Sequence, residues 1–314
     1  MKDPKTILCI DWGTSSFRGA LVDAVSRKIL KHFHSDDGCK KLFQESKDKR
    51  VSPFDYFLQH LKEMLSNEGI NQSAYDQIII SGMASSSIGM KELPYATIPF
   101  PIDGSGVVSE TFHAEELGKV ALISGAASDQ DIMRGEETQC IGLKELSDTE
   151  KFILILPGTH SKHMEIVGGR LVSFKTYLTG ELFQLICEQS VLNRSVEKAR
   201  WSPNFAESFN SGVKDALTEN LLNELFRIRA RDILGKSNDP HENYYYLSGL
   251  LIGGELQELN STPTAKLFAC DEKMRPLYEL AAQESGLTGF SFLDSEQLAS
   301  AYITGQLTIL KNLS

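Results

Sequence analysis

The chain has 314 residues, of which 41% are hydrophobic, and a formal net charge of −10 at pH 7. A chain of this length can bury a large core and suits two domains better than one. The chain is acidic overall and has no basic cluster beyond short pieces such as residues 47–50. It therefore lacks the basic surface expected of a protein that binds nucleic acid or an anionic membrane. We therefore predict a soluble protein that acts on small molecules.

The N-terminal segment and the cysteines predict a cytoplasmic protein. The sequence passes from Met1 into an apolar strand pattern without a signal region, and no stretch reaches the roughly 18 apolar residues of a membrane span. The 5 cysteines are scattered without a Cys-x-x-Cys pair, so neither a disulfide framework nor a zinc site is indicated. His160, His163 and Glu165 would need a helix to face one metal ion, whereas their surroundings indicate a hairpin.

A β-hairpin is expected over residues 7–23. Four apolar residues are typical of a buried strand, the Gly-Thr-Ser-Ser tetrad at 13–16 is typical of a tight turn, and apolar character then resumes. Gly13 lets the backbone approach a ligand, and the consecutive amides and hydroxyls of the turn suit phosphate oxygens. Asp11, at the end of the first strand, is suited to hold a magnesium ion through water. Taken alone, the same pattern also fits an ordinary hairpin.

The segment that follows holds further elements of the first half. Residues 24–30 supply another turn and strand, whereas 31–50 are polar and charged, which favours an irregular excursion over core. A helix is predicted over 53–67, because apolar residues recur at helical spacing after a serine and a proline. The apolar run 77–83 predicts a buried strand that ends at Gly82, and such strand ends present ligands in open α/β sheets.

A domain boundary is predicted shortly before residue 120. Between residues 98 and 118 the composition turns to prolines and glycines, which is typical of a crossing between domains. A strand over 119–124 then opens the second half. We accordingly divide the chain into domains 1–115 and 116–314.

A second hairpin repeats the first one. Residues 131–143 are expected to form a helix, with Asp129 or Asp131 as its N-cap. The hairpin follows over 152–167, where Gly-Thr-x-Ser recurs at 158–161. Repetition at about half the chain length indicates two related domains, each presenting a phosphate-binding hairpin to a shared cleft.

The rest of the chain is assigned mainly to packing. Apolar runs predict strands over 171–175 and 266–270, and residues 191–210 are expected to form a polar connection. Helical periodicity predicts helices over 182–191, 213–234, 244–255, 274–285 and 295–311. The helix over 244–255 carries small residues on one face, which allows another element or a nucleotide to approach closely.

The two hairpins resemble those of a known superfamily. Asp-x-Gly-Thr-Ser followed by a second Gly-Thr hairpin is similar to the sugar kinase, actin and heat-shock ATPase superfamily, in which the two hairpins clasp the phosphates of ATP. Residues 10–23, 131–139 (Asp-Ile-Met-Arg-Gly-Glu-Glu-Thr-Gln) and 156–162 (Leu-Pro-Gly-Thr-His-Ser-Lys) resemble the signature blocks of the 2-dehydro-3-deoxygalactonokinase family. Residues 179–183 and 247–253 resemble two further blocks, so the resemblance runs from end to end.

The resemblance implies an α/β fold and a reaction. It implies two ribonuclease H-like domains of the actin-like ATPase fold, each a mixed sheet flanked by helices, with an active-site cleft between them. It also implies ATP and Mg²⁺, and phosphorylation of the sugar acid 2-dehydro-3-deoxy-galactonate to its 6-phosphate in galactonate catabolism. Such a transfer asks the protein to align the reactants, neutralise charge and place one carboxylate that accepts the hydroxyl proton. A homodimer is compatible with the sequence.

The resemblance also implies roles for particular residues. Glu136 is the expected base, because Gly135-Glu136 resembles the Gly-Asp pair of related sugar kinases; Asp131 is the runner-up, and both are alternatively surface or capping carboxylates. Asp11 is expected to organise the metal. The residues expected at the nucleotide and its phosphates are Asp11, Gly13, Thr14, Ser15, Arg18, Gly158, Thr159, His160, Ser161, Lys162 and Gly253. The residues expected at the sugar acid are Gly82, Met83, Ser87, Pro94, Tyr95, Arg134, Thr179 and Glu181.

Two of these assignments have alternative interpretations from the residues alone. An arginine in an acidic segment, such as Arg134, is often only a salt-bridge partner. Glu181 is also a natural first-turn residue of a helix.

The chain departs from the family pattern at two places. Ser87 and Ile88 stand where an arginine and a glutamine are expected, and Ala269-Cys270 stand where a glycine is expected after the strand before the adenosine site. Serine cannot replace the bidentate fork that arginine offers to a carboxylate, so either another cation serves the substrate or the substrate differs. A side chain after that strand would crowd the adenosine.

These departures motivate two alternatives to the family activity. One is a sugar kinase with a different sugar or sugar-acid substrate. The other is a non-catalytic protein that senses a sugar or a nucleotide. The presence of Asp11, Glu136 and both Gly-Thr hairpins favours a kinase, because a binding protein has no need of a catalytic base.

Overall fold

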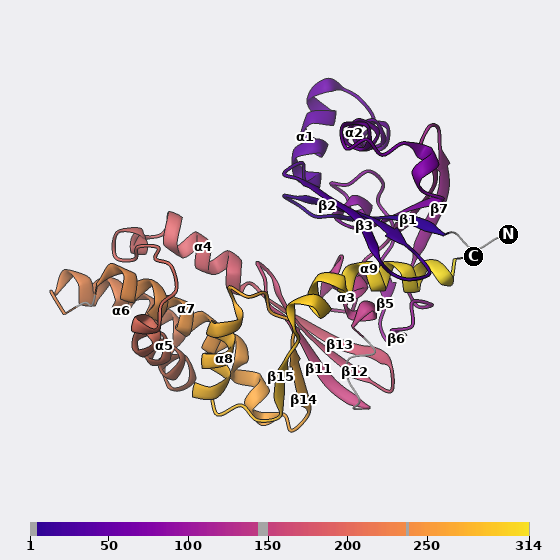
Figure 1. Ribbon diagram of the computed structural model, residues 1–314. Helices are drawn as coiled ribbons and strands as arrows, with labels where there is room; N and C mark the ends of the chain where they lie inside the picture. Colours follow the sequence, from indigo (N-terminus) through magenta and orange to yellow (C-terminus); the bar gives the residue numbers. More distant parts are fainter. Residues whose placement is uncertain (1–4, 144–149, 237–238, 314) are drawn as a thin grey trace. The chain divides into compact units, whose positions relative to one another are not determined.

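The computed structural model describes residues 5–143, 150–236 and 239–313, and the chain divides into two compact units (Figure 1). Unit 1 comprises Met1–Glu150, Ile166–Phe174 and Ala299–Ser314, and unit 2 comprises Lys151–Glu165 and Lys175–Leu298. This division differs from the boundary predicted after residue 115. The segment thought to cross between domains contains strand β7 (Ser109–Ala114), which pairs with β8 (Gly118–Ile123) in the first sheet.

The first sheet has the strand order β3-β2-β1-β4-β8-β7. Its other strands are β1 (Thr6–Trp12), β2 (Phe17–Asp23), β3 (Ile29–Ser35) and β4 (Gln77–Gly82). Strand β1 is antiparallel to β2 and parallel to β4, so the first predicted hairpin is confirmed. β1 and β4 are buried along most of their length because helices cover both faces of the sheet.

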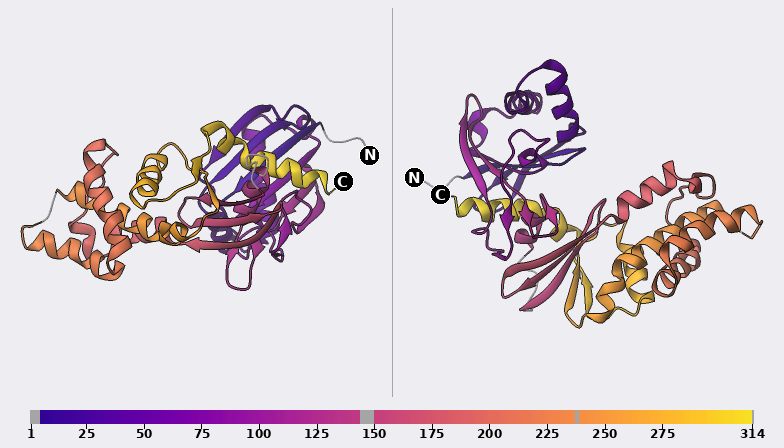
Figure 2. Two further views of the ribbon diagram at one scale, coloured as in Figure 1. Left: turned by 90° about the horizontal axis from the view of Figure 1, so that it is seen from below. Right: turned by 180° about the vertical axis from the view of Figure 1, so that it is seen from behind.

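Helices α1 (Cys39–Lys49) and α2 (Pro53–Asn67) lie on one face of this sheet, and α3 (Glu136–Gly142) and α9 (Ser295–Lys311) lie on the other (Figures 1 and 2). The bounds of α2 and α9 agree with the sequence prediction. The ring of Trp12 lies 5.0 Å from the rings of both Phe17 and Phe57, which joins the hairpin to α2.

Two predictions in unit 1 were wrong. Residues 31–50 are not irregular, because they form β3 and α1, whose Phe33, Cys39 and Leu42 are buried in the core among many exposed charged residues. The helix predicted over 131–143 begins only at Glu136, after Gly135 as the N-cap residue. The residues before it form a small sheet, β10-β9-β5, in which β5 is Ala96–Thr97, β9 is Ala126–Ala127 and β10 is Ile132–Met133.

The second sheet has the order β15-β14-β11-β12-β13-β6. Its strands are β6 (Phe100–Pro101), β11 (Lys151–Leu156), β12 (Ser161–Val167), β13 (Arg170–Tyr177), β14 (Ala265–Phe268) and β15 (Phe290–Phe292). Taken from β13, the order β13-β12-β11-β14-β15 repeats the order β3-β2-β1-β4-β8 of the first sheet. The internal repeat seen in the two hairpins therefore extends to the strand order around them.

The helices of unit 2 are α4 (Thr179–Gln189), α5 (Ala206–Thr218), α6 (Leu221–Ile233), α7 (Pro240–Leu256) and α8 (Arg275–Glu284). The single helix predicted over 213–234 is two helices, because the Asn220 side chain accepts the amides of Leu222 and Asn223 and starts α6. The predicted connection 191–210 also contains the start of α5. Short 3₁₀ turns are η1 (Gln72–Ala74), η2 (Met83–Ser85), η4 (Val191–Arg194), η5 (Pro203–Phe205) and η6 (Gln257–Ser261).

The small residues of α7 face another helix. A Cβ added to Gly249 would lie 2.0 Å from the carbonyl oxygen of Phe209 on α5, and a Cβ on Gly253 would lie 2.9 Å from the Cα of Val213. Of the two uses predicted for this face, close approach of another element is the one that the structure shows. Gly253, predicted to bind the cofactor, is buried against α5.

Candidate active site

Asp11 lies at the end of β1 in unit 1. It is paired across the sheet with Arg18, and Nη2 of Arg18 lies 2.9 Å from Oδ2 of Asp11. The Asp11 side chain is 14% exposed and that of Arg18 is 58% exposed. Burial raises the pKa of Asp11, the charge of Arg18 lowers it, and the negative charge of Glu136 raises it further. Asp11 and Glu136, from two distant sequence blocks, are therefore close enough to interact electrostatically.

Two glycines bring these blocks together. Gly82 ends β4 with φ +85°, and a Cβ there would lie 2.7 Å from the carbonyl oxygen of Trp12 and 3.0 Å from Oδ1 of Asp11. Gly135 has φ +109°, and a Cβ on it would lie 3.4 Å from the Cα of Gly82. Glycine is required here for the backbone conformation and for the close approach. The contact sets Glu136 at the start of α3 beside the ends of β1 and β4.

The Glu136-Glu137 pair has two different environments. Oε2 of Glu136 accepts the amide of Arg134 at 3.1 Å. Glu137 is buried, and its carboxylate accepts the amide of Gly135 at 2.8 Å and the hydroxyl of Thr138 at 3.0 Å. Burial raises the pKa of Glu137 to about 7, and the charge of Glu136 adds to the shift. Sequence reasoning missed Glu137, since adjacent glutamates give no indication of which side chain faces the core.

Arg134 and Tyr95, both predicted at the sugar acid, are in contact. The guanidinium carbon of Arg134 lies 4.2 Å from the centroid of the Tyr95 ring. Nη1 of Arg134 donates to the carbonyl oxygen of Ser85 at 2.7 Å and to its hydroxyl at 2.6 Å. Nε of Arg134 is buried and has no hydrogen-bond partner within the described structure. Ser85 was missed, because a serine in a serine run carries no distinguishing signal.

The other predicted substrate residues of unit 1 lie in the loops around this contact. Met83 is half-buried in η2, whereas Ser87 and Pro94 are exposed. Asp131 does not cap a helix: Oδ1 accepts the amide of Ile132 at 2.7 Å, at the start of β10.

The turn of the first hairpin rests on the start of α1. Gly13 is half-buried, and Thr14 and Ser15 are exposed. The amide of Cys39 donates to the carbonyl of Gly13 at 2.9 Å, and the amide of Lys40 donates to the carbonyl of Thr14 at 3.1 Å. These two bonds attach the turn of the first hairpin to the N-terminus of α1.

The turn of the second hairpin rests on α4 in the same manner. The amide of Glu181 donates to the carbonyl of Thr159 at 3.0 Å, and a Cβ on Gly180 would lie 2.6 Å from the carbonyl oxygen of Gly158. The exposed side chains of His160 and Glu181 also meet, with Nε2 and Oε2 2.5 Å apart. Of the predicted residues in unit 2, those from the hairpin and from the start of α4 are therefore adjacent.

Ser161 and Lys162, predicted at the phosphates, are buried on β12. The hydroxyl of Ser161 donates to Oε1 of Glu255 at 2.6 Å. His163, two residues further on, donates from Nε2 to the same oxygen at 3.0 Å, and Glu165 is paired with Lys151 at 2.8 Å. Ser161 and His163 therefore share Glu255 as their partner, and among the described residues no group of three or more His, Cys, Asp or Glu is arranged to hold a metal ion.

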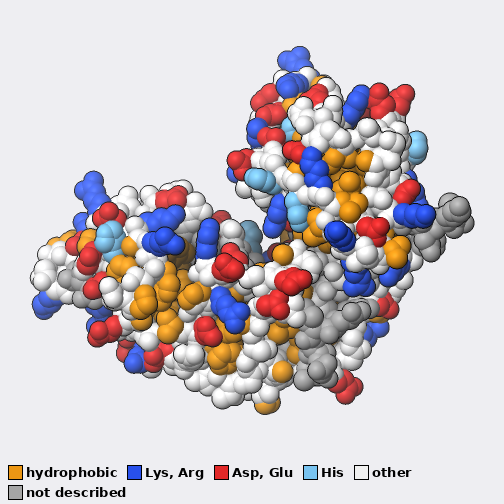
Figure 3. All heavy atoms as spheres, in the orientation of Figure 1, with side chains coloured by type: hydrophobic (Ala, Val, Ile, Leu, Met, Phe, Trp, Pro, Cys, Tyr) orange, Lys and Arg blue, Asp and Glu red, His pale blue; other side chains and the backbone are white. Residues whose placement is uncertain are grey.

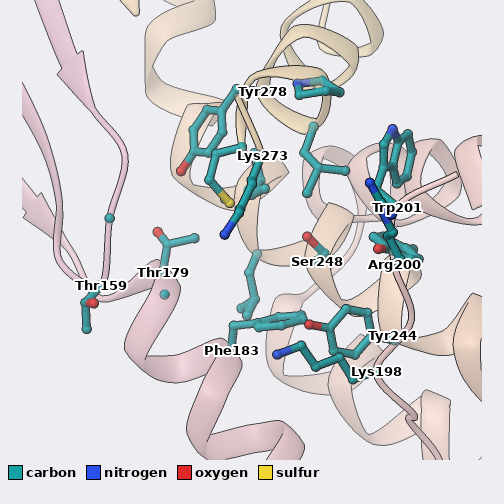
Figure 4. A pocket seen from close by; sticks show the side chains of 18 of the residues that line it. Thr159, Thr179, Phe183, Lys198, Arg200, Trp201, Tyr244, Ser248, Lys273 and Tyr278 are labelled. Atoms are coloured by element: carbon teal, nitrogen blue, oxygen red, sulfur yellow. The ribbon is translucent and has the colours of Figure 1, made fainter. Parts of the chain in front are cut away.

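A cavity of about 950 Å³ opens beside the second hairpin, entirely within unit 2 (Figure 4). Thr159 and Thr179 lie at one side of it and Arg200 and Trp201 at the other, as Figure 4 shows. Its lining includes Gly158, Thr159, Thr179, Gly180, Phe183, Lys198, Arg200, Trp201, Tyr244, Tyr245, Ser248, Leu251, Ile252, Glu272, Lys273, Met274, Pro276, Leu277 and Tyr278. Figure 3 shows hydrophobic side chains bordered by lysine and arginine side chains on the helical part of this unit.

The composition of this cavity fits a nucleotide. Its volume lies within the range of small-molecule sites, its walls are largely apolar and aromatic, and hairpin residues form one end. Ala269 and Cys270 are buried and are not among its lining residues, so they do not crowd it as expected. The aromatic walls were missed by sequence reasoning, although the Tyr244-Tyr245-Tyr246 run was visible.

The carboxylate of Asp11 fits a magnesium ion held jointly with phosphates. Mg²⁺ is usually bound by one or two carboxylates, substrate phosphates and water, so a cage of several protein ligands is not required. Asp11 is partly exposed beside the Thr14-Ser15 turn, and its one ion-pair partner among the described residues is Arg18.

The fold and these regions define an α/β protein with two matching Gly-Thr hairpins, one beside a pair of interacting carboxylates and one beside a nucleotide-sized cavity. The chain belongs to the 2-keto-3-deoxy-galactonokinase family, whose sequence model matches residues 11–304. The family resemblance noted in the sequence is thereby confirmed.

Individual relatives agree with this assignment. A 2-dehydro-3-deoxygalactonokinase of Escherichia coli (strain K12) is 32% identical over 192 residues, which are 58% of this chain and 61% of the relative. A protein of Rhizobium meliloti (strain 1021), named a probable 2-dehydro-3-deoxygalactonokinase, is 29% identical over 261 residues, 79% of this chain and 78% of the relative. A crystal structure from Sinorhizobium meliloti assigned the same activity superposes with a TM-score of 0.80 at 25% identity, covering 97% of this chain and 96% of the other.

No helix in the described parts of the chain is both long and apolar enough to cross a membrane.

Proposed function

We propose that this chain transfers the γ-phosphoryl group of ATP to 2-dehydro-3-deoxy-galactonate and forms its 6-phosphate, a step of galactonate catabolism. Family membership and the names of the relatives supply the reaction and the substrate. The single observation that carries the proposal is the placement of Glu136 beside Asp11, at the strand end next to a Gly-Thr hairpin. Phosphoryl transfer needs a carboxylate near the hydroxyl and a site for charge neutralisation, and this arrangement provides both.

Glu136 acts as the base in this proposal. It orients the sugar hydroxyl and accepts its proton as the oxygen attacks the γ-phosphorus. Glu136 is preferred to Asp131, because the charge of Glu136 reaches Asp11, whereas Asp131 lies before α3, next to the start of β10. The neighbouring Glu137 fixes the backbone of Gly135 and so holds Glu136 in place.

Each of the two hairpins carries residues that we assign to the phosphates of ATP. We assign this role to Gly13, Thr14 and Ser15 with the exposed cation of Arg18 in unit 1, and to Gly158, Thr159 and His160 in unit 2. Magnesium, when bound, supplies positive charge to the phosphate oxygens, and Asp11 is the residue that would hold it. Ser161, Lys162 and Gly253 support the site from the interior, since they are buried.

Arg134 is the cation that we propose for the substrate carboxylate. The hydrogen bonds to Ser85 and the contact with the Tyr95 ring fix its guanidinium, which we propose serves in place of the arginine that the family pattern places at Ser87. Gly82, Met83, Ser87 and Pro94 belong to the same unit and are assigned to the sugar acid; their contacts with it stay predictions. The same holds for Thr179 and Glu181, which unit 2 places beside the second hairpin.

We also propose that each unit has the ribonuclease H-like arrangement of the actin-like ATPase fold, which the repeated strand order supports. A cytoplasmic location and the absence of nucleic-acid and membrane partners stay predictions. So does a homodimer, which sedimentation velocity of the purified chain would test.

The experiment is ADP release from ATP and magnesium, with and without 2-dehydro-3-deoxy-galactonate, beside a panel of sugars and sugar acids. Release that depends on the keto-deoxy acid is the expected result. Release with a different sugar would favour the second candidate, a kinase of altered substrate, for which the exposed Ser87 is the specific observation. If folded protein that binds ATP releases no ADP with any compound of the panel, both kinase functions are overturned in favour of a non-catalytic sensor.

A further inference from the structure

We propose that Glu255 is a positioning residue that joins the second hairpin to the walls of the cavity in unit 2 and thereby sets the affinity for the nucleotide. The inference deepens the proposed function, on which it rests, because that cavity is assigned to ATP. No motif of the sequence pointed to Glu255, which lies in the last turn of α7.

The carboxylate of Glu255 is fully buried and accepts four hydrogen bonds from side chains. Oε1 accepts the hydroxyl of Ser161 at 2.6 Å and Nε2 of His163 at 3.0 Å. Oε2 accepts the hydroxyl of Thr179 at 2.5 Å and that of Tyr278 at 2.9 Å. A carboxylate has about four lone-pair sites, so this one is saturated.

The donors come from three elements that surround the nucleotide cavity. Ser161 follows the exposed turn of the second hairpin on β12. Thr179 begins α4, and the next residue, Gly180, packs on the carbonyl of Gly158 in that turn. Tyr278 belongs to α8, and both Thr179 and Tyr278 line the cavity (Figure 4). One carboxylate therefore connects the phosphate end of the cavity to two sides of its wall.

The negative charge of Glu255 strengthens this junction. Burial acts to raise its pKa, but the hydrogen bond and charge of His163 and the hydroxyls of Ser161 and Thr179 outweigh burial and hold the pKa below its ordinary value. Hydrogen bonds to an ionised acceptor are roughly twice as strong as neutral ones, and the buried setting keeps water from competing. The ring of His163 is itself held at 4.5 Å from that of Tyr177.

The substitution Glu255→Gln tests the inference. Glutamine keeps the size but offers one acceptor oxygen, so the donors that faced the other oxygen meet an amide group. We expect the Kd for ATP, measured by titration calorimetry without sugar acid, to rise about tenfold or more, since two of the four bonds lose their acceptor, either the pair from β12 or the pair from α4 and α8. In the single-bond variants Ser161→Ala and Tyr278→Phe, which keep the bond to Thr179, the KM for the sugar acid at saturating ATP should stay within about twofold.

A matched control is available a few residues away. Glu258 is 60% exposed and paired with Lys175, and it lies outside the cavity lining. Glu258→Gln makes the same chemical change at the surface and should leave ATP binding and turnover as in the wild type.

Two single-bond variants keep the test decisive if Glu255→Gln does not fold. Ser161→Ala removes the tie to the hairpin, and Tyr278→Phe removes the tie to α8 while keeping the ring. Each should raise the Kd for ATP by about threefold to tenfold. Added to Glu255→Gln, the one whose acceptor oxygen has become the amide group should cost little more, because its bond is already lost.

Unchanged ATP affinity in folded Glu255→Gln, or in both single-bond variants, would overturn the inference. An equal weakening of ATP and sugar-acid affinity in the single-bond variants, or full additivity in both combined variants, would overturn it as well, since either result indicates a general structural effect. Failure of the wild type to bind ATP would instead refute the proposed function, so the two failures are distinguishable.

Discussion

The pH dependence of folding stability should report the buried carboxyl of Glu137. Its pKa is raised from an ordinary 4.5 to about 7, first by burial and then by the charge of Glu136. A carboxyl whose pKa is higher in the folded than in the unfolded chain stabilises the fold fully below the unfolded value, and this contribution is lost as the pH rises through the folded value. Glu137→Gln keeps the size and an acceptor for the amide of Gly135 and cannot ionise.

The magnitude follows from the two pKa values. At about 1.4 kcal/mol for each tenfold change in proton affinity, the difference between 4.5 and about 7 amounts to about 3 kcal/mol once the pH lies well above 7. Most of that loss falls between about pH 5 and about pH 8, where we expect the wild type to lose about 2.5 kcal/mol relative to Glu137→Gln.

Urea unfolding of both proteins across this pH range measures the difference between their free energies of unfolding. The contributions of the other titrating groups cancel in this difference, because both proteins contain them. The exposed Glu115 of the same unit provides the control, because Glu115→Gln should follow the wild type. Glu136→Gln should move the loss to lower pH, since it removes a like charge. Parallel curves for the wild type and Glu137→Gln between about pH 5 and about pH 8 would refute the reasoning.

The other predictions concern activity and packing. Glu136→Gln should lower kcat at least about 100-fold while calorimetric ATP affinity is retained, and retained turnover would remove Glu136 as the base. Arg134→Lys should raise the KM for the sugar acid about tenfold or more with kcat less affected, because lysine lacks the planar fork; an unchanged KM would contradict this role. Asp11→Asn should raise the magnesium concentration needed for ADP release, whereas an unchanged magnesium titration would exclude it as the metal residue. Gly180→Ala should destabilise the fold by about 1 to 3 kcal/mol in urea unfolding, whereas Gly254→Ala, with open space at its Cβ position, should not.

Much of the local structure was determined by local sequence. The turn glycines of both hairpins, the apolar run over 77–83 and the periodicity of 53–67 predicted elements that the structure contains. Their signals are short-ranged, because turn conformation and side-chain period depend on neighbouring residues. The blocks around Asp11 and Glu136 also identified the family, and the structure brings these two residues together through Gly82 and Gly135.

Where composition misled, tertiary packing had decided the structure. Residues 31–50 are rich in charge, but β3 gains hydrogen bonds from β2, and α1 buries Cys39 and Leu42 against the core. Likewise β7 belongs to the first sheet only because β8 pairs with it. Propensity could not reveal these placements, since partners elsewhere in the chain provide the stabilisation.

The interior of the candidate site was determined by tertiary structure alone. Glu255 is bonded to side chains 23 to 94 residues away along the chain, and Arg134 to a serine 49 residues away. Buried polar groups need partners, but sequence does not say which partners the fold will supply. The sequence by itself thus determined which residues are candidates for phosphoryl transfer. The packing of glycines and buried carboxylates decided which of them meet, because those contacts form only when distant segments close around one core.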